Sequence, residues 1–126
     1  MGPEGKLRDA VTKNFKKLRT SGERIWWLKV HGGPAQRAGV PDFIGCYLGL
    51  MFAIELKVDT KVSLIQQSEL RWLDAAGGMV AVCRTLGDVE DFLREVRNVA
   101  TNLLKGDDCY WLDADGGIRG FNPETD

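Results

Sequence analysis

Two carboxylates and a lysine stand at the ends of two predicted neighbouring strands. Asp42 follows Gly39-Val40-Pro41, and Glu55 lies two residues before Lys57. Side chains alternate along a strand, so Glu55 and Lys57 should project to one side while Leu56 points into the core. The apolar stretch 43–53, punctuated by a glycine, indicates a hairpin that brings Asp42 beside Glu55. Such carboxylates can hold a divalent ion, and ion and lysine together can polarise a water that attacks a phosphodiester.

The segment from Glu4 to about Thr20 predicts an amphipathic helix, because its apolar residues form one stripe at helical spacing. Glu4 lies at the N-terminal end of this stripe, which leaves two interpretations open. An acid there is favoured by the helix dipole, or it is a carboxylate directed toward the site. Spacing alone favours the first. The stripe consists of Leu7, Ala10, Val11, Phe15 and Leu18.

Residues 25–30 predict a strand that runs into a glycine-rich turn and a polar loop before Asp42. His31, the chain's one histidine, follows this strand directly. A lone histidine is more often structural or exposed than catalytic, although this position favours a role near the site. Lys29 and Arg37 flank the approach to Asp42, where a phosphate backbone would need cations; both are equally explained as surface charges.

A second helix is predicted from Ser63 to about Ala76, where Gly77-Gly78 ends it. Ser63 and Gln66 have the spacing of a capping box, so Gln66 already has a complete structural explanation. The continuous apolar run 79–83 predicts a strand buried on both faces.

A third amphipathic helix should begin after a capping arrangement at Thr85–Asp88 and end at Gly106. Residues 109–121 predict a small terminal hairpin with a glycine turn. The order helix, three strands, helix, strand, helix, hairpin favours a mixed sheet flanked by helices.

Length and composition predict one globular domain of ordinary type, with 126 residues, 44% hydrophobic and 28% charged. No apolar run approaches the roughly 18 residues of a membrane span, and no signal peptide is visible. Three widely spaced cysteines show neither zinc spacing nor a disulfide framework, which favours a reducing cytoplasm.

Charge is divided unevenly along the chain although the net charge is only −1. Residues 1–62 carry eleven Lys or Arg against six Asp or Glu, a balance of +5. Residues 63–126 carry six against twelve, a balance of −6. This division allows a basic face toward a polyanion, but charges scattered over solvated helices explain it equally well.

Taken together, Gly39-Val40-Pro41-Asp42, Glu55-Leu56-Lys57 and Gln66 resemble the VRR-NUC branch of the PD-(D/E)xK nuclease superfamily, in particular its small stand-alone phage-type members. A bare Pro-Asp with Glu-x-Lys is a weak pattern. The helix carrying Glu4, the segment 29–32, and the capped helix followed by two glycines and a strand make the ensemble specific. The resemblance covers roughly residues 4 to 100, and the acidic and lysine positions show no departure.

The resemblance implies a restriction-endonuclease-like α/β fold, with residues 1–106 as a VRR-NUC-type nuclease domain and 107–126 as its C-terminal hairpin and tail. It implies Mg²⁺ or Mn²⁺ held by Asp42, Glu55, the backbone carbonyl of Leu56 and Glu4, which shifts Glu4 to the second interpretation. Lys57 would orient and help to deprotonate the attacking water. Gln66 looks like the family's glutamine that supports the lysine or the water, in addition to capping its helix.

The function expected from this resemblance is a metal-dependent, structure-selective DNA endonuclease. The size of the chain favours a Holliday junction resolvase that acts as a homodimer. Its expected location is the cytoplasm, either of a bacterium or of the host cell of a phage. A flap, nicking or single-strand endonuclease of a phage replication module, and a non-catalytic DNA-binding module, are the alternatives. No membrane and no nucleotide cofactor are expected. The candidate DNA contacts are Lys29, His31, Arg37 and Lys61.

Overall fold

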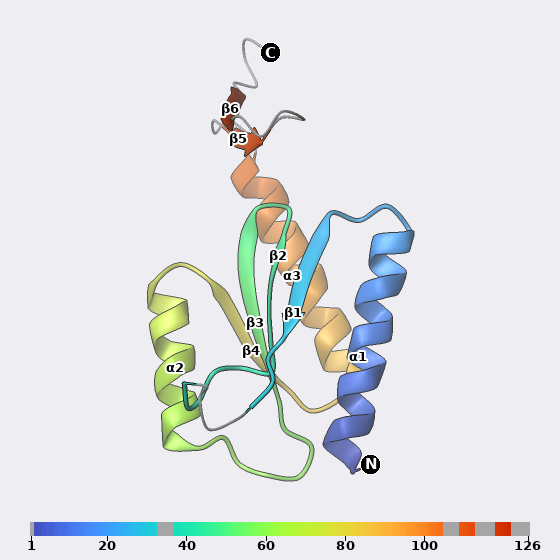
Figure 1. Cartoon of the computed structure of the whole chain (residues 1–126), viewed down its shortest axis with the longest axis vertical. Coiled ribbons are helices and arrows are strands. Elements are labelled where there is room, and N and C mark those ends of the chain that lie inside the picture. Colours follow the sequence, from blue (N-terminus) through green and yellow to red (C-terminus); the bar gives the residue numbers. More distant parts are fainter. Residues whose placement is uncertain (1, 33–36, 105–108, 113–117, 122–126) are drawn as a thin grey trace.

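The computed structural model of the chain describes residues 2–32, 37–104, 109–112 and 118–121. Figure 1 shows a sheet flanked by helices, with a separate small hairpin following the last helix. The elements run in the order α1 (Pro3–Thr20), β1 (Ile25–Lys29), β2 (Phe43–Tyr47), β3 (Leu50–Leu56), α2 (Leu64–Ala75), β4 (Met79–Cys83), α3 (Leu86–Leu104), β5 (Cys109–Leu112) and β6 (Ile118–Phe121). The predicted α/β class and element order are confirmed.

The main sheet is mixed, with strand order β1-β2-β3-β4. β1, β2 and β3 form an antiparallel meander, and β4 pairs with β3 in parallel after the crossover through α2. The β2–β3 hairpin closes through Leu48 and Gly49, both with positive φ (51° and 88°), as a two-residue turn of the kind that follows strand twist. Because Phe43 pairs with Ile54, the residues just beyond this pair, Asp42 and Glu55, meet at the open end of the hairpin.

Helices α1 and α3 cover one face of the sheet and form the main core with it. Phe15 of α1 is fully buried, and its ring stacks on Trp27 of β1 at 5.1 Å between centroids. It also packs against Phe43 and Phe52 of the central strands, and Phe52 meets Phe92 of α3 edge-on. Burial of these aromatic side chains stabilises the packing of α1 and α3 on the sheet.

The opposite face of the sheet carries α2, which contacts β4. Since Trp27 points toward α1, strand alternation directs Trp26 and Leu28 to the face on which α2 lies. Both remain about half exposed, at 53% and 48%, because α2 lies over the other edge of the sheet. The β1 side of this face is therefore open and apolar.

β4 corrects one prediction from the sequence. The apolar run 79–83 was expected to be a strand buried on both faces, but β4 is an edge strand. Four of its five residues are only partly buried or exposed, and Val82 keeps 38% of its surface. The physical reason is that no described strand pairs with the outer edge of β4, and the helices on its two faces leave part of its surface exposed.

The remaining helix boundaries follow local signals. Asp88 accepts hydrogen bonds from the main-chain N–H groups of Arg84 and Thr85, and Thr85 Oγ1 accepts one from Asp88, which confirms the capping arrangement before α3. These donors lower the pKa of the Asp88 carboxyl. The terminal hairpin is confirmed as the antiparallel pair β5–β6, although its predicted glycine turn lies outside the described residues. None of the helices described here combines the length and apolar character needed to cross a membrane.

Candidate active site

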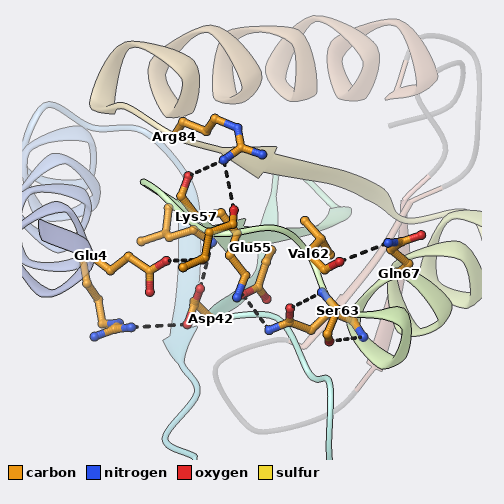
Figure 2. Close-up of polar contacts among 12 residues, drawn as sticks. Glu4, Asp42, Glu55, Lys57, Val62, Ser63, Gln67 and Arg84 are labelled. Carbon is orange, nitrogen blue, oxygen red and sulfur yellow. Dashed lines mark hydrogen bonds and ion pairs between the residues drawn. The ribbon is translucent and has the colours of Figure 1, made fainter.

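The candidate site lies where the β2–β3 hairpin opens, beside the N-terminal ends of α1 and α2 (Figures 1 and 2). Asp42 directly precedes β2, and its Oδ2 accepts a hydrogen bond from the Leu56 N–H at 2.8 Å. This bond ties the Asp42 carboxylate to the strand that carries Glu55. The predicted meeting of Asp42 and Glu55 is thus explained by strand register and by this cross-strand hydrogen bond.

Glu55 is the only buried charged residue in the described part of the chain, with 3% of its surface exposed. Its Oε1 accepts a hydrogen bond from Gln66, whereas the buried Oε2 has no hydrogen-bond partner. Burial, together with the neighbouring Asp42 carboxylate, raises the pKa of Glu55 to about 8. A buried carboxylate with an unpartnered oxygen and a second carboxylate next to it is an arrangement that a bound cation would relieve.

Lys57 projects to the same side as Glu55, as strand alternation predicts. Its Nζ lies 4.0 Å from Glu55 Oε1, and 15% of its side chain is exposed. The Lys57 N–H donates to the Cys83 carbonyl at 3.0 Å, which continues the β3–β4 ladder past the end of β3. The ammonium group therefore lies beside Glu55 at the edge of the site, and the main chain that carries it is held by the sheet.

Gln66 performs two tasks at once. Its Oε1 accepts from the Ser63 N–H at 3.0 Å, and the Gln66 N–H donates to Ser63 Oγ at 3.2 Å, which completes the capping box of α2. At the same time its Nε2 donates to Glu55 Oε1 at 3.2 Å. The capping box fixes the orientation of the amide, so the structural role and the contact with the site are parts of one arrangement.

Helix α1 brings Glu4 and Arg8 to the same side of the site, because they are four residues apart. Arg8 was not singled out from the sequence, yet its guanidinium lies 3.5 Å from Asp42 Oδ1 and both side chains are partly buried. Glu4 Oε1 accepts a hydrogen bond at 3.3 Å from the hydroxyl of Thr60, which lies in the loop that follows β3. Figure 2 shows Glu4 reaching toward that loop, with Asp42 beneath it.

The predicted DNA contacts lie around this centre with different surroundings. Arg37 donates through Nε and an Nη to Glu69 of α2, so it braces the loop before Asp42 against that helix. His31 and Lys61 are exposed and Lys29 is partly buried. Their contact with nucleic acid stays a prediction.

The donor set fits a hard cation at Asp42 and Glu55, on the evidence of the unpartnered Glu55 oxygen and the two adjacent carboxylates. Within residues 2–32, 37–104 and the two terminal strands, however, no group of three or more His, Cys, Asp or Glu side chains converges closely enough to hold a metal ion. Glu4 is engaged with Thr60 instead. The roles of Glu4 and of the Leu56 carbonyl oxygen as further metal ligands stay predictions.

Comparison with known proteins gives one line of support. No family model and no curated protein matches the sequence. Among solved structures, a chain described as "VRR_NUC domain" superposes with a TM-score of 0.60 at 21% sequence identity. The alignment covers 75% of this chain and 97% of that chain, so nearly the whole of the matched domain has a counterpart here. The chain therefore has the fold of a VRR_NUC domain.

Proposed function

We propose that the chain is a metal-dependent endonuclease that hydrolyses DNA phosphodiester bonds. The observation that carries this proposal is the buried Glu55, which lies beside Asp42, with Lys57 4.0 Å away at the open end of the hairpin. The fold of a VRR_NUC domain, a type of domain whose name denotes a nuclease, supports it independently. A module that only bound DNA would gain nothing from two adjacent carboxylates facing a phosphate.

Asp42 and Glu55 would hold Mg²⁺ or Mn²⁺, with the Leu56 carbonyl and Glu4 as further oxygen ligands. The ion would supply Lewis-acid activation of the phosphate and of a water molecule. In the same proposal, Lys57 orients the attacking water, helps to remove its proton, and offsets negative charge that develops on the phosphate. Gln66 keeps the Glu55 carboxylate in place through its hydrogen bond to Oε1.

The finer part of the proposal is selectivity for branched DNA, with a Holliday junction as substrate and a homodimer as the active form. A site whose carboxylates and lysine are directed at a phosphate favours recognition of shape and backbone. Two symmetric cuts in a four-way junction require a twofold pair of sites. The open apolar face at Trp26 and Leu28 offers a surface for such a pair.

The test is a cleavage assay with Mg²⁺ or Mn²⁺ on four-way junction, flap, nicked, duplex and single-stranded DNA, with Lys57→Ala in parallel. Paired symmetric nicks in the junction, abolished in the variant, would support the full proposal. Equal cutting of all branched forms would retain the nuclease and remove junction selectivity. Absence of cutting on every substrate would overturn the proposed activity.

Gln66→Ala is expected to lower the cleavage rate about 10-fold and to cost about 1 kcal/mol of stability, because it removes the Gln66 half of the capping box and the hydrogen bond to Glu55. Ser63→Ala removes the cap alone and is the matched control. It should cost a similar stability while retaining most of the activity. Equal loss of activity in both variants would reduce Gln66 to a helix cap.

A further inference from the structure

A basic groove of about 480 Å³ lies beside the candidate active site, between α2, β4 and the loop that precedes α2. Three of its lining residues are cations from three different parts of the chain: Lys61 from the loop, Arg71 from α2 and Arg84 from the end of β4. No acidic residue lines it. Leu70 and Val82 supply an apolar floor.

Each of the three cations has N–H groups left for an external anion, although one Nη of Arg84 is engaged with carbonyl oxygens of the loop. Lys61, Arg71 and Arg84 are exposed, and among the described residues none of them forms an ion pair with a carboxylate within 4.0 Å. Arg8 and Arg37, by contrast, are paired with acids at the site and on α2. Asp88 lies near Arg84 and offsets part of its charge. A surface cluster of three exposed cations still favours an anionic partner.

The walls of the groove are fixed to the candidate active site. Arg84 donates through one Nη to the carbonyl oxygens of Lys57 and Thr60, at 3.1 and 3.3 Å, as Figure 2 shows. On the other side, Gln67 Nε2 donates to the Val62 carbonyl at 3.0 Å and ties the loop to α2. The loop 57–62 therefore carries Lys57 toward the site at one end and Lys61 into the groove at the other.

We infer that this groove binds the sugar–phosphate backbone of the DNA strand that is cleaved, a few nucleotides away from the scissile phosphate. Lysine and arginine that neutralise phosphates supply most of the affinity for nucleic acid, and a guanidinium can contact a phosphate through two N–H groups. The apolar floor of Leu70 and Val82 suits the sugars of such a backbone. The inference rests on the proposed nuclease function and extends its substrate site beyond the two carboxylates.

The groove is tested by the double variant Lys61→Gln/Arg71→Gln, which leaves the loop contacts of Arg84 intact. DNA binding is measured in Ca²⁺ by fluorescence anisotropy between 50 and 200 mM salt. We expect the affinity to fall on the order of 10-fold, and the slope of log K against log salt to decrease by about 1.5 to 2, because about two phosphate contacts are lost. In Mg²⁺, KM should rise while kcat at saturating DNA stays within about twofold of the wild type.

The matched control is Lys16→Gln/Arg24→Gln, which removes one exposed lysine and one exposed arginine at the end of the sheet away from Asp42. It should leave the affinity and the salt slope as in the wild type. If the wild type cuts DNA and the groove variant keeps the same affinity and salt slope, the inference about the groove is wrong and the proposed function still holds. A wild type that neither binds nor cuts DNA would overturn the groove and the proposed function together.

Discussion

Asp42→Asn and Glu55→Gln are each expected to lower DNA cleavage on the order of 1,000-fold, equivalent to about 4 kcal/mol of transition-state stabilisation. Both changes replace a charged oxygen ligand by a neutral amide of nearly the same shape. Asn at position 42 still offers an oxygen to the Leu56 N–H, so the hairpin end keeps its hydrogen bond. The loss should therefore come from the cation and the chemistry it supplies, with the fold retained.

The measurement is single-turnover cleavage of the preferred substrate in Mg²⁺, paired with DNA binding in Ca²⁺. Binding should stay close to that of the wild type, because the groove and the surface cations are untouched. Asp59→Asn, an exposed acid in the loop after Lys57, controls for the loss of one negative charge near the site. Joint loss of binding and cleavage in a folded Asp42→Asn protein would contradict the role assigned to this carboxylate.

Local sequence signals predicted most of what positions the site. The apolar character of 43–53 and the glycine within it predicted the hairpin, and the observed register of that hairpin places Asp42 against Glu55. The Ser63 and Gln66 spacing gave the start of α2 because a capping box is a local arrangement of neighbouring residues. The continuous apolar run gave β4 at its observed bounds, Met79–Cys83.

The features missed from the sequence depend on how elements pack. The edge position of β4 follows from the crossover through α2, which no local pattern encodes. Arg84 holds the loop after Lys57, a contact across 24 to 27 residues that has no sequence signature. The position of Arg8 near the site could have been predicted. It lies four residues after Glu4, so both residues share one helix face, and Glu4 is directed toward the site.

Glu55 should also make the stability of the protein depend on pH. Its pKa is about 8 in the folded chain, against an ordinary value of 4.5 in the unfolded chain. Between these values the folded state binds more protons than the unfolded state, so this group lowers the stability as pH rises from about 4.5 to about 8. The cause is the burial of the ionised carboxylate beside Asp42, and the loss is complete above the folded pKa.

Glu55→Gln removes this titration and should stabilise the protein relative to the wild type by roughly 4 to 5 kcal/mol at pH 8.5, with little difference at pH 4.5. Urea unfolding in EDTA at both pH values measures the effect, and Glu90→Gln, on the exposed surface of α3, controls for net charge. Added Mg²⁺ should then stabilise the wild type at pH 8.5 and leave Glu55→Gln nearly unchanged, because the ion compensates the buried charge only where that charge exists. Two results would contradict the idea that the buried Glu55 carboxylate serves to bind a cation. One is a Glu55→Gln protein no more stable than the wild type at pH 8.5, and the other is a Glu55→Gln protein that Mg²⁺ stabilises as much as the wild type. The stability that Glu55 costs the fold would then need another explanation, whereas the expected result ties this cost directly to metal binding.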